Sequence, residues 1–402
     1  MAMTEQVPEP FPFHLLPADF GTPARLYARR HQSPLGQVRL PSGDLAQLVL
    51  HYADVERVLR DRRFSRNFRY PGAPRLVAVD DMSANPDAIV NLDPPEHTRL
   101  RRTVQSAFRP GHAARWRPVV QGIADELLDG IAAAGPPADL VACFARLLPI
   151  RVICDLMGVP AGDQGQLIGW TGIFFATSAV SASDRAEAGN AFIAYLRGLV
   201  AARRAAPADG LLDSLISACD AEGILSEAEL YQMIAAMFIG GQENTSAILA
   251  RGIFTLLRHP DQYEALSADP GLVDSAVEEI LRFDVASEGA FLRVTTHDVR
   301  LSAGTVPAGS AVQVSLPAAN RDGDRFADPE RFDIRRAPNP HLTFGAGAHF
   351  CVGAPLARLE LAIALGATVS RFPRLRLAGA VADVRYAQDT LVRSLLRLPV
   401  TW

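Results

Sequence analysis

Long apolar runs are missing from this chain of 402 residues. No stretch approaches about 18 uninterrupted apolar residues, so we expect no membrane-spanning helix. The N-terminal segment MAMTEQVPEPFPFHLLPADF has no basic stretch followed by an apolar run, so it does not resemble a secretory signal peptide. These absences predict a cytoplasmic protein that does not act at a membrane.

Cysteine is also scarce. The chain has four, at positions 143, 154, 219 and 351, with no CxxC pair and no dense disulfide framework. The first three lie in apolar helical stretches, where a buried reduced thiol is expected. Cys351 lies in a glycine-rich loop instead. The sequence therefore predicts a reducing compartment and one cysteine with a special role.

Neither sign of charge dominates. The formal net charge of -4 gives no reason to expect nucleic acid or an anionic lipid surface as a partner. Hydrophobic residues make up 49% of the chain and charged residues 21%, a balance that allows a large core. Because no repeat, low-complexity tract or charged linker interrupts the sequence, we expect residues 1–402 to form a single domain.

Helical periodicity dominates the middle of the chain. Apolar residues recur at helical spacing over about 119–131 and 140–156, and each run ends at glycine and proline. The longest helical pattern begins at Ser226, which fits a capping box with Glu229, and continues to about Arg258. A helix of this length is able to cross the whole domain.

Two adjacent glycines, Gly240 and Gly241, interrupt this long predicted helix. Glycine inside a helix costs up to about 1 kcal/mol relative to alanine, so a compensating reason is expected. One interpretation is close packing against a neighbouring helix. The other is that a flat ligand or a small gas approaches the backbone there.

Strand signals are fewer and lie mostly near the N-terminus and around residues 290–316. They predict a minor β region in a mainly α fold. The expected strands are Val38–Leu40, Leu45–Leu50, Val299–Leu301 and Ala311–Ser315.

The segment FGAGAHFCVG, residues Phe344–Gly353, carries the clearest chemical signal. Its glycines allow a close backbone approach to a metal and N–H donation to the Cys351 sulfur. A helix predicted over Ala354–Ala367 follows, and its N-terminus favours thiolate over thiol. For a lone cysteine beside a glycine, an ordinary buried thiol in a turn is the expected alternative. The full pattern FGxGxHxCxG, however, is similar to the haem-binding loop of the cytochrome P450 family.

This resemblance implies a cytochrome P450 fold of the soluble bacterial, actinomycete-like class, with a long central helix over haem. It implies haem b as cofactor, with Cys351 as the axial thiolate ligand of the iron and Phe344, Gly345 and Gly353 as further cofactor-binding residues of the loop. Cationic side chains are implied to meet the two haem propionates in charge-assisted pairs. These are His97, Arg101, Arg293 and His349.

Glu279 and Arg282 share a helix face at a spacing of three, where an exposed pair is worth under about 1 kcal/mol. They also resemble the family's ExxR motif. The later segment Pro329–Phe332 resembles the family segment that supplies a second arginine. The resemblance therefore implies a buried structural cluster of Glu279, Arg282 and Arg331 that fixes the chain before the cysteine loop.

The central helix departs from the family pattern. Glu243 matches the family's acid, but Asn244 stands where a threonine is usual, and Thr245 follows one place later. An asparagine amide donates a hydrogen bond but cannot relay a proton as a hydroxyl does. Proton delivery would then use Glu243, at the edge of the inward face, with Thr245, ordered water or the substrate. From the helical period, that face carries Ala236, Ile239, Gly240 and Asn244.

The resemblance places the substrate against several segments that are far apart in sequence. Their mixture of aromatic and polar side chains indicates a medium-sized, partly polar natural product. The predicted pocket residues are Phe68, Tyr70, Ala236, Ile239, Gly240, Gly289, Ala290, Phe291 and Thr390.

The activity implied is that of a monooxygenase in secondary metabolism, which activates O2 to hydroxylate, couple or desaturate its substrate. Electrons from NAD(P)H would arrive through a separate ferredoxin and ferredoxin reductase, because the chain has no flavin or iron–sulfur segment. The docking candidates are Arg102, Arg109 and Arg358 on an expected monomer. Two alternatives stay open. One is a haem-thiolate enzyme that does not insert oxygen from O2 (peroxide-using, nitrating or isomerising), and the other is a non-enzymatic haem gas sensor.

Overall fold

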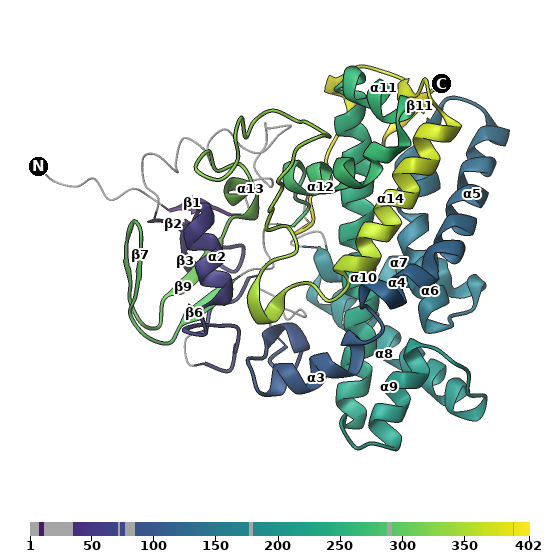
Figure 1. The fold of residues 1–402 in the computed structure, drawn as a ribbon. Helices are drawn as coiled ribbons and strands as arrows, with labels where there is room; N and C mark the ends of the chain where they lie inside the picture. The colour runs from purple at the N-terminus through teal and green to yellow at the C-terminus, as the bar shows by residue number, and fades with distance from the viewer. Residues whose placement is uncertain are drawn as a thin grey trace, which may run out of the picture.

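A helical body and a smaller sheet region lie side by side in this protein (Figure 1). The computed structural model describes residues 8–11, 35–70, 73–76, 85–176, 180–287, 292–388 and 390–402. Three predicted pocket residues, Gly289, Ala290 and Phe291, lie outside these described residues. Among the described residues, no helix has the length and apolar character needed to cross a membrane.

Helices account for most of the described chain, as the sequence predicts. A π-helical turn at Val141–Ala145 precedes α6, so the apolar run predicted over 140–156 forms two elements rather than one continuous helix. The α-helices are α2 (Tyr52–Arg60), α3 (Glu96–Gln105), α4 (Pro110–Ala113), α5 (Arg117–Ala134), α6 (Leu147–Met157), α7 (Gln164–Phe175), α8 (Ala182–Ala205), α9 (Leu211–Asp220), α10 (Glu227–Leu257), α11 (Pro260–Ala268), α12 (Val273–Phe283), α13 (Leu316–Ala319) and α14 (Ala354–Arg371).

The long helix α10 organises the helical body. Its capping box is present: the Ser226 hydroxyl accepts from the Glu229 backbone N–H, and the Glu229 carboxylate accepts from the Ser226 N–H at 2.8 Å. With 31 residues, α10 is roughly 45 Å long. It packs against α6, α7, α8, α9, α11, α12 and α14, which explains why most of its side chains are buried. The prediction of one long helix across the fold is confirmed.

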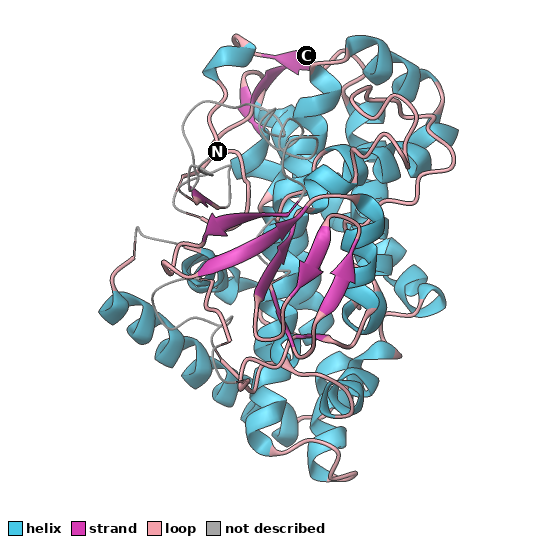
Figure 2. Ribbon diagram, turned by 90° about the vertical axis from the view of Figure 1, so that its left-hand side faces the viewer, coloured by secondary structure: helices cyan, strands magenta, loops and turns pink. Residues whose placement is uncertain are grey.

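The strands gather mainly in one six-stranded sheet beside the helices (Figure 2). Its order is β1-β2-β3-β9-β6-β4, and β2 and β3 form a hairpin whose turn contains Gly43 at a φ of 92°. All four predicted strands form, with ends shifted by a few residues at most. The strands are β1 (Glu9–Pro10), β2 (Leu35–Arg39), β3 (Leu45–Val49), β4 (Phe64–Ser65), β5 (Ala138–Asp139), β6 (Arg293–Thr295), β7 (Val299–Leu301), β8 (Gly304–Val306), β9 (Ala311–Val314), β10 (Arg376–Leu377) and β11 (Pro399–Thr401).

Candidate functional site

The glycine-rich loop before α14 is held in a tight, defined shape. Gly345 and Gly347 have φ angles of 72° and 71°, a left-handed backbone that side chains disfavour. A Cβ on Gly347 would lie 2.6 Å from the Leu59 carbonyl oxygen of α2, so no larger residue fits there. The Cys351 N–H donates to the Phe344 carbonyl at 2.9 Å and closes the loop. These contacts fix Cys351 immediately before the N-terminus of α14.

Two opposing effects act on the Cys351 thiol. The Cys351 side chain keeps some solvent-accessible surface, but protein atoms make up most of its surroundings. This desolvation raises the pKa of its thiol. The backbone N–H groups of Gly353 and Ala354, together with Arg101, lower that pKa, but burial outweighs them. The N-terminus of α14 therefore acts toward the thiolate, as expected, but its effect is smaller than that of burial. A metal ion coordinated by the sulfur would remove the proton outright, which fits a ligand role for Cys351.

The four cationic residues assigned to the propionates come together from three separate elements. His97 and Arg101 lie on α3, Arg293 begins β6, and His349 belongs to the cysteine loop. The His97 and His349 rings have centroids 4.2 Å apart, and Arg101 Nη1 donates to the Ala348 carbonyl at 3.2 Å. His97 and Arg293 are each only 3% exposed. The structure thus builds a cationic cluster beside the cysteine loop, and its members His97 and Arg293 are buried.

The negative charge of Asp93 acts on His97 and Arg293, but burial outweighs it in both. Burial lowers the pKa of His97 to about 4, and it also lowers the pKa values of Arg101, Arg293 and His349. Among the described residues, no carboxylate forms an ion pair with any of the four, and the buried Nε2 of His349 has no hydrogen-bond partner. Buried charges are stable only when paired. The donor set therefore fits a ligand that carries two carboxylates, as the haem propionates do.

The predicted ExxR pair forms a fully buried ion pair on α12. Glu279 accepts from Nε and Nη2 of Arg282, both at 2.8 Å, and neither side chain is exposed. Arg336 Nε lies 3.2 Å from a Glu279 carboxylate oxygen, and Asn339 Nδ2 donates to the same carboxylate at 3.1 Å. Glu279 thus links α12 to the chain that leads into the cysteine loop.

Arg331 was predicted as the third member of this cluster, and that prediction is wrong. Its side chain is 67% exposed, and the neighbouring Phe332 takes the inward position instead. Only the backbone carbonyl of Arg331 contributes, by accepting from Arg282 and Arg336. Arg336 supplies the second guanidinium. No local sequence signal distinguishes Arg336 from its neighbour Arg335, since both follow the same segment.

The two adjacent glycines of α10, Gly240 and Gly241, lie in different surroundings, and each supports a different interpretation of why glycine is present. A Cβ on Gly241 would touch the Ile153 side chain of α6 at 3.4 Å, so this glycine allows close helix packing. Gly240 is exposed although its neighbours Ile239 and Gln242 are buried, and a Cβ there would meet nothing within 4 Å. The helix therefore faces open space at Gly240, as the second interpretation requires.

One helical turn further along α10 lie the three residues assigned to proton delivery. Glu243 and Asn244 are partly exposed, whereas Thr245 is buried. Burial raises the pKa of Glu243, and the positive charge of Arg146 acts in the opposite direction. Asn244 lies one turn after Gly240, on the same side of the helix. The positions of Gly240 and Asn244 agree with the predicted inward face. Ile239, which was predicted on the same face, is buried.

Parts of the predicted pocket meet between the sheet and the C-terminal segment. Phe68 and Phe175 pack against one apolar cluster that also contains Leu391. The Leu391 N–H donates to the Phe175 carbonyl at 2.8 Å, and Ala176 and Thr390 form an isolated β-bridge. Tyr70 is half-buried, and Ala236 is partly exposed on α10. Segments that are more than 200 residues apart in sequence thus form one wall.

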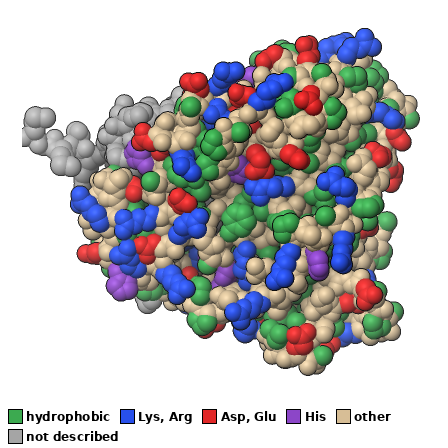
Figure 3. Space-filling view, viewed as in Figure 1, with side chains coloured by type: hydrophobic (Ala, Val, Ile, Leu, Met, Phe, Trp, Pro, Cys, Tyr) green, Lys and Arg blue, Asp and Glu red, His purple; other side chains and the backbone are tan. Residues whose placement is uncertain are grey.

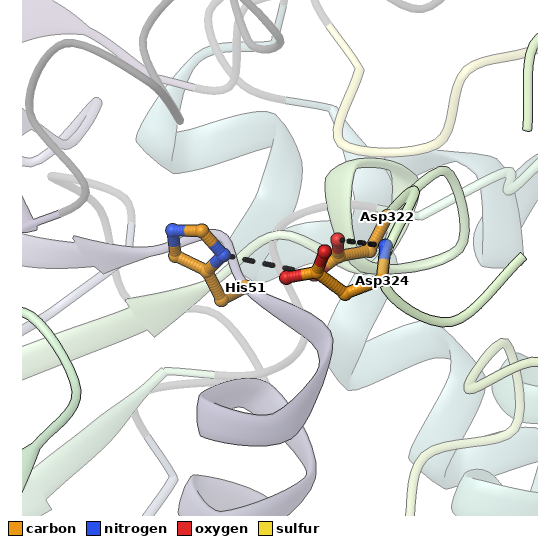
Figure 4. A group of neighbouring side chains, drawn as sticks. All are labelled: His51, Asp322 and Asp324. Carbon is orange, nitrogen blue, oxygen red and sulfur yellow. Dashed lines mark hydrogen bonds and ion pairs between the residues drawn. The ribbon is translucent and has the colours of Figure 1, made fainter.

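A second polar cluster, of His51, Asp322 and Asp324, lies where α2 begins (Figure 4). Asp322 accepts from the backbone N–H groups of Tyr52 at 2.8 Å and Asp324 at 3.1 Å. His51 Nδ1 lies 3.7 Å from Asp322. The Asp322 carboxylate thus caps the N-terminus of α2, which explains the cluster without a bound ligand.

The fold and the cysteine loop together define a haem-thiolate protein, and comparison with known proteins agrees. The cytochrome P450 family model matches residues 181–378. The chain is 40% identical to the mycinamicin IV hydroxylase/epoxidase of Micromonospora griseorubida, over 100% of both proteins. It is also 40% identical to the nocardicin C N-oxygenase of Nocardia uniformis subsp. tsuyamanensis, over 95% of this chain and 98% of that protein.

Solved structures show the same likeness. The LnmA cytochrome P450 hydroxylase from the leinamycin biosynthetic pathway of Streptomyces atroolivaceus matches with a TM-score of 0.88 and 40% identity, over 98% of this chain and 100% of that one. This chain belongs to the cytochrome P450 family, which confirms the predicted family and fold. Membership implies a haem held by a cysteine thiolate, a small-molecule substrate and redox partners.

Proposed function

We propose that this protein is a haem-thiolate monooxygenase that oxidises a medium-sized, partly polar natural product in secondary metabolism. The observation that carries the proposal is the joint placement of Cys351 and the buried cationic cluster of α3, β6 and the cysteine loop. The relatives support it, since they include a hydroxylase/epoxidase of mycinamicin IV and an N-oxygenase of nocardicin C. We also propose that residues 1–402 act as a single cytochrome P450 domain.

The residues of this chain have distinct tasks in the proposed reaction. Haem, when bound through Cys351, supplies the activation of O2, and thiolate donation favours cleavage of the O–O bond. His97, Arg101, Arg293 and His349 hold the two propionates and so orient the cofactor. The open space at Gly240 would leave room for oxygen and substrate beside the bound cofactor. The wall of Phe68, Phe175 and Leu391 excludes water from the substrate.

Glu243 and Asn244 divide proton delivery and hydrogen bonding between them. Because burial raises the pKa of Glu243, its carboxyl holds a proton closer to neutral pH than an exposed glutamic acid does. A proton donor works best when its pKa lies near the working pH. The Asn244 amide donates and accepts hydrogen bonds but has no proton to transfer, so it orients oxygen or substrate while Glu243 supplies the proton.

Electrons reach the enzyme, in this proposal, from NAD(P)H through a separate ferredoxin reductase and an acidic ferredoxin. Arg102 and Arg109 are exposed and form no ion pair among the described residues, so both are available for docking. Arg358 is engaged differently: it binds Glu278 at 2.6 and 2.9 Å and stacks on the Phe344 ring at 4.6 Å. Arg358 therefore supports the cysteine loop. None of the four cysteines forms a disulfide, which agrees with a reducing cytoplasm, and we expect the protein to act as a monomer.

A spectroscopic test comes first. The reduced protein with carbon monoxide should absorb at the position typical of a thiolate-ligated haem, and Cys351→Ala should abolish that band. A histidine-type spectrum in the wild-type protein would contradict the ligand assignment.

Product analysis then tests the reaction. Candidate metabolites are screened by the spectral shift of the bound haem, and the best ligand is incubated with ferredoxin, reductase, NADH and isotopically labelled O2. Labelled oxygen in the product, with NADH consumed in proportion, supports the monooxygenase. A product that carries no label would favour the peroxide-using, nitrating or isomerising alternative, and ligand binding without any turnover would favour the gas sensor.

A further inference from the structure

A fifth buried cation, Arg66, lies beside the cationic cluster and has no part in the assignments above. It follows strand β4, which pairs with β6 in the register Phe64↔Thr295 and Ser65↔Val294. Continuing this antiparallel register by one residue places Arg66 opposite Arg293. Arg66 is 6% exposed, and its charge contributes to lowering the pKa of Arg293. Like charges opposite one another destabilise a strand pair, so this arrangement needs an explanation.

The hydrogen bonds of the Arg66 guanidinium explain why two arginines are tolerated opposite each other. Nη1 donates to the Leu292 carbonyl at 2.9 Å, Nε to the Val90 carbonyl at 2.7 Å, and Nη2 to Asn91 Oδ1 at 2.8 Å. Leu292 immediately precedes Arg293, and residues 90 and 91 lie in the segment that leads into α3. The rigid, planar fork of a guanidinium fixes such a set of acceptors in one geometry.

The backbone of Arg66 continues the link toward His97. The Arg66 N–H donates to Asp93 Oδ1 at 3.0 Å, and Ser65 Oγ donates to the other oxygen of that carboxylate. The Asp93 carbonyl in turn accepts from the His97 N–H at 3.0 Å, in the first turn of α3. One residue thus connects the starting points of both elements, β6 and α3, that supply propionate partners.

We propose that Arg66 is a positioning residue for the cofactor: it holds Arg293 and His97 in register and adds a positive charge that the two propionates neutralise. The Asp93 carboxylate accepts from the Arg66 backbone N–H, and its negative charge acts on the guanidinium groups of both Arg66 and Arg293. The bound propionates balance the remaining charge of the cluster. The inference rests on the proposed assignment of Arg293 and His97 to the propionates.

Two variants separate the geometric part of this role from the electrostatic part. Arg66→Met removes both the donors and the charge at similar length. Arg66→Lys keeps the charge, but a single ammonium cannot reproduce the planar fork that reaches three acceptors among the described residues. The matched control is Arg185→Met, because Arg185 is also buried, at 5% exposed, and donates to the Ile173 and Ala176 carbonyls at 2.8 and 2.9 Å, away from the cationic cluster.

Three quantities are measured on the purified holoproteins: the rate of haem transfer to excess apomyoglobin, the reduction potential of the haem iron, and the unfolding midpoint. Arg66→Met should release haem about tenfold faster, as is typical when a residue that orients binding groups is lost. Its potential should become more negative, because a nearby positive charge favours the reduced, less positive iron. Arg66→Lys should also release haem faster but keep a potential near that of the wild type.

The control defines what a merely structural role looks like. Arg185→Met should lower the unfolding midpoint while its haem-transfer rate and potential stay at the wild-type values. The inference is wrong if both Arg66 variants release haem at the wild-type rate, or if Arg66→Met changes only the unfolding midpoint. Should Arg66→Met fail to fold, the haem-transfer rate of Arg66→Lys decides. A wild-type protein without a thiolate-type carbon monoxide spectrum would instead contradict the proposed function itself.

Discussion

Glu243 and Asn244 are adjacent on α10 but differ in the chemistry that they offer. Burial raises the pKa of Glu243 above the usual 4.5, with Arg146 as the opposing charge. Its carboxyl therefore keeps a proton at pH values where an exposed glutamic acid has lost it. Asn244 has no titratable proton at all. Their separation by about 100° around the helix means that both cannot face the cofactor directly.

Replacement of Glu243 tests its role as proton source. In the wild type, product formation should fall as pH rises through the raised pKa of Glu243, because the deprotonated carboxylate has no proton to give. Glu243→Gln should slow turnover on the order of 10²-fold, lose this pH dependence and show a larger solvent isotope effect. Rates of product formation across a pH series, in light and heavy water, measure all three. An unchanged rate would leave water or substrate as the relay.

Replacement of Asn244 tests how far the usual family chemistry applies. Asn244→Thr restores the hydroxyl that the family pattern has at this position. If the protein is an ordinary hydroxylase, the fraction of NADH consumption that yields product should stay the same or rise. Loss of activity with an unchanged carbon monoxide spectrum would show instead that Asn244 has a specialised role, and it would favour the reactions that insert no oxygen from O2.

At the scale of elements, the Glu279–Arg282–Arg336 cluster joins α12 to the chain before the cysteine loop. Arg336→Met leaves the buried Glu279 carboxylate with Arg282 as its guanidinium partner but without one charged hydrogen bond, so it should lower the free energy of unfolding by about 1.5–3 kcal/mol. Arg331→Met is the control in the same segment, and its exposed side chain should change that free energy by no more than about 0.5 kcal/mol. Urea unfolding of both variants, followed by haem absorbance, measures the difference. Equal losses of unfolding free energy in the two variants would show that Arg331 contributes to the Glu279 cluster as much as Arg336 does.

Helix α14 carries a buried acid that makes stability depend on pH. Glu360 is buried, its Oε2 has no hydrogen-bond partner, and burial raises its pKa well above the usual 4.5. Below pH 4.5 both the folded and unfolded chains hold this proton. As pH rises further, the unfolded chain ionises first, so stability falls by up to about 1.4 kcal/mol per pH unit until the folded pKa is passed.

Glu360→Gln should remove this penalty. The variant should match the wild type near pH 4.5 and become increasingly more stable than it as pH rises. Urea unfolding of wild type and variant at several pH values gives the comparison. The idea fails if the difference in unfolding free energy between the two proteins does not grow with pH.

At the scale of the whole molecule, exposed arginines near the cysteine loop would attract an acidic partner protein. The chain contains no lysine, so every blue side chain in Figure 3 is an arginine. Arginines are spread over the lower part of this face, where α3 and the cysteine loop lie in Figure 1, and acidic side chains are fewer there. Exposed charge of one sign steers an oppositely charged protein and loses its effect in salt.

Substitution of Arg102 and Arg109 tests this docking face. The double variant with both changed to alanine should raise the KM for ferredoxin several-fold at low ionic strength, with a weaker salt dependence than the wild type. Arg397→Ala is the control, because this exposed arginine lies beside β11 at the other end of the helical body. Steady-state reduction kinetics at several salt concentrations measure the effect. A KM that responds equally to both substitutions would remove Arg102 and Arg109 from the docking face.

The sequence by itself determined the features that depend on neighbouring residues. The capping box of α10 needs only Ser226 and Glu229 at the right spacing, and the cysteine loop needs only glycines beside Cys351. Helix and strand periods are equally local, so nearly all the predicted elements form. The resemblance to the family also indicated four cationic residues that the structure brings together, and we propose these as the propionate partners.

Only the tertiary structure decided which side chains meet across long distances in the chain. Arg331 and Arg336 lie in one irregular segment without a period, so the direction of each side chain depends on how that segment packs against α12. Arg66 carries no motif, and its position follows from the pairing of β4 with β6, more than 200 residues later. Burial likewise outweighs the helix N-terminus at the Cys351 thiol. Desolvation is set by everything that surrounds a group, and a local sequence pattern does not contain that information.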